Sequence, residues 1–442
     1  MRKVYKISIA MALLALLLAG CSMPTLDDLY CLPKRANSES NLQLVIDEAM
    51  DGLQYSAPIS GENQQTVQAA DLDGDGKDEY LLFAKDNSEK PMKILVFSEI
   101  AVGYVLMDTI EGYGLAFDFV DYANVDDRPG LEIIVGRQVS DQVVRSVSVY
   151  RFTSGFARQL MSAPYSRVLT ADFDGNEMDD LFLIYPGQTD DSPAAATLYS
   201  FKDEQMRRGP EMNLSCQVED LKRVQQSKLS DQTQAVFISM ATDDNQITTD
   251  VFAAKDGQIR QVISGHKTDT LRNYNIYPED IDADGVINLP VLTPLHVPDG
   301  VAEQYCIQWY SLDSQGTLGH VLDTFHNHKD GWYIRLNPEW ASRFTLLQTE
   351  DEFAFCLWDD SKKKVTPFFS ILVLTGPDRE EQALEQGRYL LYKGETEVYV
   401  MTLQVEMSDE DAKALVNSFR LIRMDWNNEE IRGDENEKGP DS

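Results

Sequence analysis

The chain is short of positive charge and of the local patterns that many enzymes carry. Its 442 residues hold 39 Lys and Arg against 73 Asp and Glu, a formal net charge of -34. Binding to nucleic acid or anionic lipid through a basic face needs clustered Lys and Arg, so this balance argues against both. The sequence also lacks a nucleophile elbow, a phosphate loop, a dinucleotide fingerprint and a metalloprotease helix. We therefore expect no nucleic-acid partner, and no motif identifies a catalytic residue.

Cysteine and histidine are scarce, with five of each. The spacing of the four cysteines beyond position 21 matches no disulfide framework and no zinc pattern, so disulfides and buried free thiols both stay open. These residues are Cys31, Cys216, Cys306 and Cys356. His326 and His328 are the only close histidine pair, and on a strand both rings would point to one side, where a transition metal could bind. An exposed polar linker is the simpler interpretation.

Long apolar runs are missing except near the N-terminus. Basic residues there precede an apolar run from Ile7 to Leu18, which is too short to span a bilayer and has the layout of a secretory signal. The run ends in Leu-Ala-Gly-Cys, which resembles the bacterial lipobox and implies lipidation of Cys21. We expect residues 1–20 to be a signal peptide and residues 21–59 a lipid-anchored tether with a short helix. The expected location is a bacterial cell membrane, on its extracytoplasmic side.

Acidic stretches with one shared pattern recur three times along the chain. Each places oxygen-bearing side chains at positions 1, 3, 5 and 9, an arrangement that suits a hard divalent cation with about six to eight oxygen ligands. We therefore predict calcium as the cofactor. The predicted ligands are Asp71, Asp73, Asp75 and Glu79 in the first loop, Asp172, Asp174, Asn176 and Asp180 in the second, and Asp280, Asp282, Asp284 and Asn288 in the third.

The loops resemble the first half of an EF-hand, which needs a bidentate Glu at position 12 and flanking helices. Position 12 is apolar in all three loops, where it is Leu82, Leu183 or Val291. A short apolar run follows each loop, which is typical of a buried strand rather than a helix. The pattern disfavours an EF-hand and predicts a loop-plus-strand unit.

Two weaker copies of this unit lie between the strong ones. Residues 124–132 keep three of the four ligand positions but have Arg128 at position 5. That guanidinium could stand in for the cation by pairing with Asp126 and Glu132. The stretch from Ser227 to Ala235 keeps the strand and has lost the ligands. The five units repeat about every 50 residues, a period typical of repeat architectures whose neighbours bury a continuous core.

Three or four short strands per unit, joined by Gly, Asp, Asn and Ser turns, are the pattern of a propeller blade. The units are similar to FG-GAP or VCBS repeats, which are known from the integrin α-subunit propeller and from bacterial surface proteins. The resemblance implies that the positions of Asp71, Asp73, Asp75 and Glu79 bind calcium on a loop between strands of one blade. The expected fold class is mainly β, a propeller-like array of about five blades over residues 60–327.

Beyond residue 328 the acidic loops stop and aromatic residues become dense. Five apolar strand patterns precede a helix predicted from Asp409 to Phe419, with Ser408 as its N-cap. We expect a small α+β domain over residues 328–424, similar in outline to the Mog1/PsbP-type modules of bacterial lipoproteins. Residues 425–442 are acidic and polar, and we expect a disordered tail.

These observations support two hypotheses about function. The first is a non-enzymatic binding or adhesion scaffold, a calcium-stiffened propeller that holds an unknown surface protein or glycan near the membrane. The second is an extracellular enzyme acting on polysaccharide, with an active site at the propeller axis. The second hypothesis rests on fold analogy and predicts a cleft lined by carboxylates with His, Tyr or Arg beside them.

Overall fold

The computed structural model describes residues 37–422, apart from short gaps at 140–144, 188, 190–191, 243, 245, 256–257, 267–269, 273–275, 296–302, 338–342, 350–351 and 360. The expected signal peptide, the lipidation site at Cys21, Cys31 and the expected acidic tail lie outside the described residues. Within them, no helix has the length and apolar character needed to cross a membrane.

The protein is mainly β, as predicted, and its described strands pair antiparallel into six sheets. We number the sheets 1 to 6 along the chain. Sheet 1 holds β1 (Gln54–Tyr55), β2 (Val67–Ala70), β3 (Glu79–Lys85), β4 (Met92–Ile100) and β5 (Gly103–Gly112). Sheet 2 holds β6 (Ala116–Ala123), β7 (Glu132–Gln138), β8 (Arg145–Thr153) and β9 (Phe156–Tyr165).

The next two sheets repeat this layout. Sheet 3 holds β10 (Arg167–Ala171), β11 (Asp180–Tyr185), β12 (Ala195–Lys202), β13 (Gln205–Arg208) and β14 (Met212–Asn213). A 3-10 turn, η1 (Val218–Asp220), leads into sheet 4, which holds β15 (Leu221–Lys228), β16 (Gln234–Ala241), β17 (Ile247–Lys255) and β18 (Gln258–Ile263).

The last two sheets contain the C-terminal strands. Sheet 5 holds β19 (Leu289–Pro294), β20 (Tyr305–Leu312), β21 (Leu318–Asn327), β22 (Trp332–Leu336) and β28 (Phe419–Leu421). Sheet 6 holds β23 (Phe344–Gln348), β24 (Glu352–Asp359), β25 (Lys364–Thr375), β26 (Arg388–Lys393) and β27 (Glu397–Leu403). Among the described residues three helices accompany the sheets, α3 (Asn37–Ala49), α5 (Arg379–Ala383) and α6 (Asp409–Val416).

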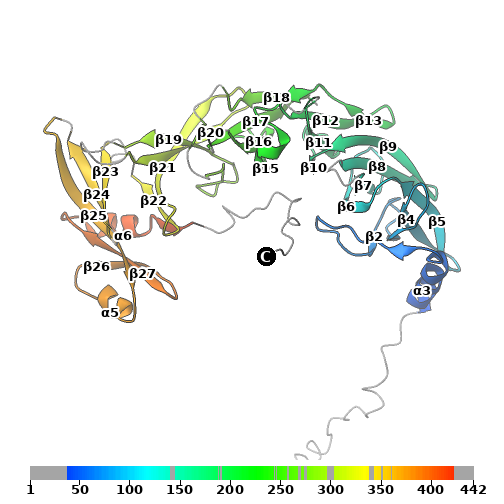
Figure 1. Ribbon diagram of the computed structural model, residues 1–442, viewed down its shortest axis with the longest axis horizontal. Coiled ribbons are helices and arrows are strands. Elements are labelled where there is room, and N and C mark those ends of the chain that lie inside the picture. The colour runs from blue at the N-terminus through cyan, green and yellow to red at the C-terminus, as the bar shows by residue number, and fades with distance from the viewer. Residues whose placement is uncertain are drawn as a thin grey trace, which may run out of the picture.

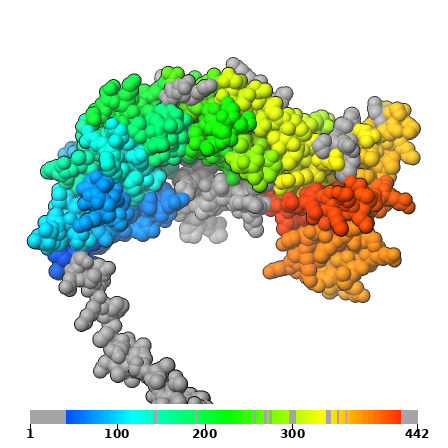
Figure 2. Space-filling view, turned by 180° about the vertical axis from the view of Figure 1, so that it is seen from behind, coloured from blue at the N-terminus to red at the C-terminus, as the bar shows by residue number. Residues whose placement is uncertain are grey.

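The sheets follow one another around an open arc, with sheets 1 and 6 at its two ends (Figure 1). Strands β2, β6, β10 and β15 lie at the inner edge of the arc, and β5, β9, β13 and β18 lie at its outer edge (Figure 1). Seen from behind, the space-filling surface keeps the same curved outline (Figure 2). The predicted series of antiparallel sheets is therefore present, and the described residues form an open arc and no closed ring.

Apolar clusters join each sheet to the next. One strand in each of sheets 1 to 4 is almost wholly buried, because its continuous apolar run packs on both faces; these strands are β3, β7, β11 and β16. Between sheets 1 and 2, for example, Phe83 and Phe117 meet edge to face with ring centroids 5.2 Å apart. Further clusters join sheets 2 with 3, 3 with 4, 4 with 5 and 5 with 6. Neighbouring units thus bury a continuous core, as in other repeat proteins.

The N-terminal helix packs against sheet 1. Ile46 of α3 lies in an apolar cluster with Leu82 and Phe97, and the Asn41 side chain accepts a hydrogen bond from the Tyr104 amide at 2.8 Å. The helix therefore covers a side of the first sheet.

The C-terminal helix begins where the sequence predicts, because the Ser408 side chain accepts a hydrogen bond from the Asp411 amide. It ends at Val416, before the predicted Phe419, since Phe419 starts β28 and pairs with β22. The expected domain boundary at residues 327 and 328 falls inside sheet 5, where the β21–β22 hairpin spans it. Sheets 5 and 6 also share one apolar cluster.

Cysteine and histidine occupy structural positions in the described chain. Cys216, Cys306 and Cys356 are free thiols, and burial raises the pKa of each. His326 is buried on β21 and stacks on Tyr333 with ring centroids 4.9 Å apart. His326 is therefore part of sheet 5, whereas His328 is exposed in the turn between β21 and β22.

Candidate metal centres

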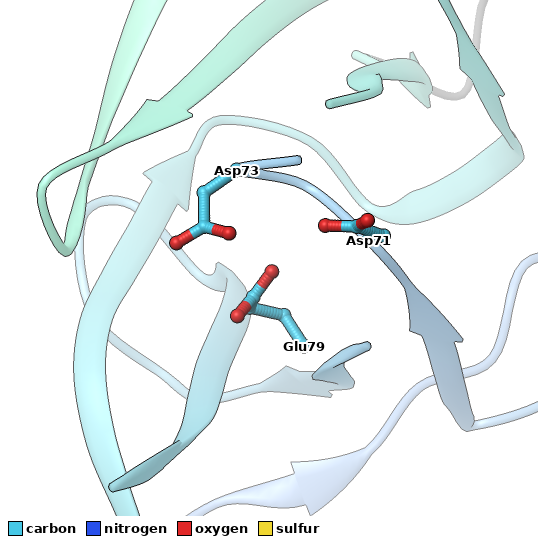
Figure 3. Close-up of side chains that lie close together, drawn as sticks. All are labelled: Asp71, Asp73 and Glu79. Carbon is cyan, nitrogen blue, oxygen red and sulfur yellow. The ribbon is translucent and has the colours of Figure 1, made fainter. Parts of the chain in front are cut away.

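Three groups of carboxylates converge, one in each of the three predicted acidic loops. In each group the candidate ligand oxygens all lie within 4.8 Å of one another. This is about twice a calcium–oxygen distance of roughly 2.4 Å, so one ion could contact every member of a group. Figure 3 shows the side chains of the first group facing a common space. The groups are Asp71, Asp73 and Glu79; Asp172, Asp174 and Asp180; and Asp280, Asp282 and Asp284.

Position 9 of each loop closes the loop onto its own start. Glu79 opens strand β3, and its carboxylate accepts a hydrogen bond from the Leu72 amide at 3.0 Å. Asp180 and Asn288 accept equivalent bonds from Phe173 and Ile281 at 3.3 Å and 3.2 Å. The residue that each amide belongs to is buried, so the loop is pinned to the core at this point.

Position 1 supports the tip of the loop. The Asp71 carboxylate accepts hydrogen bonds from the Gly74 and Gly76 amides at 2.8 Å and 3.0 Å. Both glycines have positive φ angles, 74° and 84°, which L side chains rarely adopt. The aspartates Asp172 and Asp280 accept similar amide hydrogen bonds in their own loops. The acidic side chains therefore shape the loop as well as face the common space.

Position 5 differs from one loop to another. Asp75 lies outside the convergent group, and its carboxylate accepts a hydrogen bond from the Lys77 amide at 2.8 Å. The Asn176 side-chain oxygen likewise accepts from the Met178 amide at 2.7 Å. In the third loop Asp284 joins the convergent group. Asn288 is fully buried, and its side-chain oxygen is engaged by the Ile281 amide.

The electrostatics of the groups fit a bound cation. Burial, with the nearby charge of Asp73, raises the pKa of Glu79. Burial raises the pKa of Asp180 to about 6. Burial and the charge of Asp284 raise the pKa of Asp282, whose Oδ1 is buried with no hydrogen-bond partner. A buried carboxylate oxygen without a donor is costly, and a cation among these oxygens would offset that cost.

The second unit holds a different side chain among its carboxylates. The guanidinium of Arg151, on β8, pairs with Asp126 and lies 4.0 Å from Glu132. All three side chains are buried, and Val125 donates its amide to Glu132 at 2.9 Å as in the other loops. Burial, together with Asp126, raises the pKa of Glu132.

The sequence interpretation of Arg128 is therefore wrong. Its guanidinium points away from the loop and pairs with Glu204 at 3.0 Å, where both side chains are about half exposed. Arg151 makes the predicted contacts instead, and it also reaches Glu204 at 3.0 Å. No local spacing could reveal this, because Arg151 lies 25 residues beyond Asp126 and meets it only through the fold of sheet 2.

The loops touch one another in series along the arc. The Leu131 amide donates to the Asp71 carbonyl at 3.0 Å, and the Asp179 amide donates to the Asn124 carbonyl at 2.6 Å. A Cβ on Gly74 would lie 2.3 Å from Pro129, so glycine permits the close approach of the first two loops. The loops therefore lie at the junctions between sheets.

The fourth unit, which has lost its ligands, also contacts the next loop. Its Ser227 hydroxyl accepts a hydrogen bond from the Ile287 amide at 3.2 Å. Lys228 and Val286 form a bridge beside it. Contact between successive units is thus kept even where no metal group is present.

No protein-family model matches the sequence, and no curated protein matches it. Among solved structures, a provisionally assigned 6-phosphogluconolactonase from Bacteroides uniformis is similar at 10% identity, covering 67% of this chain and 82% of its own, with a TM-score of 0.30. A protein from Lactobacillus plantarum is similar at 12% identity, covering 71% and 94%, with a TM-score of 0.25. Both scores are low, so neither likeness transfers a substrate or mechanism to this chain.

The comparison contradicts the hypothesis of a non-enzymatic binding or adhesion scaffold. One of the two structures is described as a provisionally assigned 6-phosphogluconolactonase, the description of the other names no activity, and neither is described as an adhesion module.

Proposed function

We propose that the protein is a calcium-binding lipoprotein of the extracytoplasmic membrane surface, in which three ions fix the junctions between successive β-sheets of the arc. The convergence of three carboxylate groups in equivalent loops carries this proposal. The FG-GAP or VCBS resemblance supports it, because calcium sits on the corresponding loop in that family. The lipobox-like Cys21 supports the location.

Calcium fits these groups better than a transition metal does. Every side chain in the three groups is a carboxylate, and hard cations prefer such oxygens, whereas zinc and copper favour histidine and cysteine. The loops also contact one another through backbone hydrogen bonds. An ion that rigidifies one loop would therefore stabilise two sheets.

The test is thermal unfolding of the purified protein in millimolar calcium and in excess chelator. Extracellular calcium modules bind at roughly 0.1 to 1 mM. With free calcium at ten times the dissociation constant, each site would contribute about 1.4 kcal/mol, or about 4 kcal/mol for three independent sites. We expect a melting temperature several degrees higher in calcium, and no equal rise in magnesium or sodium at matched ionic strength. Identical melting in calcium and chelator would contradict the proposal.

A further inference from the structure

A second candidate site lies at the inner edge of the arc, between sheets 2 and 3. A cavity of about 320 Å³ opens there, within the range of small-molecule sites. Its walls come from the segment before β2, from β6, from the ends of β8 and β9, and from β10. Its charged and phenolic lining residues are Glu62, Asp118, Asp121, Arg145, Tyr165 and Arg167.

A buried polar network forms one wall of this cavity. The Tyr165 hydroxyl donates a hydrogen bond to Asp118, and the Nε of Arg145 lies 3.6 Å from the same carboxylate oxygen. All three residues are less than a tenth exposed. Burying a charge is costly unless it is paired, so the carboxylate of Asp118 is held in place by two partners at once. The wall is thus built of polar groups with fixed orientation.

The backbone is irregular where this network forms. The register of β6 against β7 shifts between Phe117 and Val120, a bulge that lets Phe117 and Asp118 both be buried. Bulges often re-aim side chains beside functional sites. On β7, a Cβ at Gly136 would lie 2.3 Å from the Tyr165 hydroxyl oxygen, so glycine makes room for the phenol.

The opposite walls supply further hydrogen-bonding groups. The Ser60 amide and hydroxyl both donate to the Asp118 carbonyl, at 2.8 Å and 2.9 Å, which fixes the segment carrying Glu62 against β6. Strand β10, which also lines the cavity, is only half-buried along its whole length, and Arg167 lies at its start. Phe119 and Leu169 add apolar surface to the lining.

We propose that this cavity binds a small sugar acid, a hydroxylated ring or chain that carries one carboxylate. The guanidinium of Arg167, whose Nη1 also donates to the Ser166 carbonyl at 2.8 Å, would pair with the ligand carboxylate, since Arg has five N–H donors and matches carboxylate geometry. The carboxylates of Glu62 and Asp121 accept hydrogen bonds from hydroxyl groups. The apolar side chains contact the carbon face of the ring. This binding is independent of the calcium groups.

The experiment is calorimetric titration of the purified protein with D-galacturonate and D-glucuronate, each compared with its neutral hexose. Calcium is held constant and in excess, because uronates themselves bind calcium. We expect one uronate to bind about tenfold or more tightly than its neutral counterpart, because loss of a charge-assisted hydrogen bond has an effect of this size. Inorganic phosphate serves as a probe for simple anion binding.

Variants identify the site. Arg167→Ala should weaken uronate binding about tenfold or more, whereas Arg158→Ala, an exposed arginine on β9, should leave it unchanged. Both variants must keep the calcium-dependent melting of the parent. Absence of saturable uronate binding, equal affinity for the neutral hexose, tighter binding of phosphate, or insensitivity to Arg167→Ala would each overturn this proposal. Because the calcium response is measured on the same samples, such a failure leaves the calcium proposal standing.

Discussion

The loop of sheet 2 and the three acidic loops share one backbone arrangement but differ in whether a cationic side chain lies among their carboxylates. In all four, the side chain at position 9 accepts the amide of position 2, a buried residue. In sheet 2 the guanidinium of Arg151 lies among the carboxylates. In the other three loops, no Lys or Arg among the described residues forms an ion pair with the carboxylate group. Lys77 of the first loop pairs with Glu99 instead.

This difference suggests that each carboxylate group needs a positive charge, supplied either by an arginine side chain or by a bound cation. Carboxylates brought together and partly buried repel one another and lose hydration, so each group needs a compensating cation. Arg151 supplies that cation permanently, whereas the other loops would take it from solution as calcium. The loop of sheet 2, which should bind no calcium, is thus a control within the same chain for the three proposed calcium loops.

The largest effect is expected for Arg151→Ala. This change leaves Asp126 and Glu132 buried with no cation, and breaking a buried ion pair in this way costs about 3 to 5 kcal/mol. The unfolding midpoint in denaturant, measured in chelator, should fall accordingly. The midpoint of Arg151→Lys should lie between those of the parent protein and Arg151→Ala. Arg158→Ala, which removes an exposed arginine of the neighbouring strand, is the control. A loss below about 1 kcal/mol would mean that Arg151 is not the internal cation.

A smaller effect, whose sign depends on the presence of calcium, is expected for Asp282→Asn. The Oδ1 of Asp282 has no hydrogen-bond partner, so the amide should be tolerated by the fold. In calcium the variant should lose about 1.4 kcal/mol, the contribution of one site at ten times its dissociation constant. In chelator it should be as stable as the parent or more stable, because repulsion from Asp284 is relieved. Asp203→Asn, in an exposed turn, should change neither value.

The pH dependence of stability should report on Glu132 of sheet 2 through a variant, because the pKa values of Glu79, Asp180 and Asp282 in the calcium loops are raised as well. Burial and Asp126 raise the folded-state pKa of Glu132 above its ordinary value of 4.5, so the folded state binds its proton more tightly than the unfolded state does. The resulting stability is present at acid pH and is lost as the pH rises from about 4.5 through neutrality. Glu132→Gln should flatten this part of the curve, measured in chelator by denaturant unfolding. An unchanged slope would show that Glu132 titrates normally.

The smallest effect is expected for Arg128→Ala. Its ion pair with Glu204 is about half exposed on both sides, and such pairs contribute about 0 to 1 kcal/mol. The same measurement as for Arg151→Ala therefore distinguishes the two arginines directly. A loss for Arg128→Ala as large as that for Arg151→Ala would restore the interpretation based on sequence spacing.

Local patterns predicted the local structure well. The apolar runs after the loops form strands β3, β7, β11, β16 and β19, and Ser408 caps its helix, because burial periodicity and capping depend on neighbouring residues. The mainly β class follows from the same strands. Whether the array closes into a ring depends on how sheets pack, which the spacing of residues does not encode.

The sites were predictable only in part. The shared pattern of positions in the acidic loop correctly brings Asp71, Asp73 and Glu79 together, because all three lie within nine residues of one loop. The guanidinium of sheet 2 and the inner cavity could not be found in this way, since their side chains come from different strands or sheets. Position 5 differs between loops: Asp75 and Asp284 each accept a backbone amide, but only Asp284 belongs to a convergent group.

The number of calcium ions bound per chain tests the central claim most directly. Equilibrium dialysis of the purified protein against radioactive calcium should give three ions per chain, and two for Asp282→Asn. The loop of sheet 2 should bind none while Arg151 is present. Binding of no calcium, or of a fourth ion that is lost on mutation of Asp126, would contradict the account that calcium and arginine fill the same place in equivalent loops.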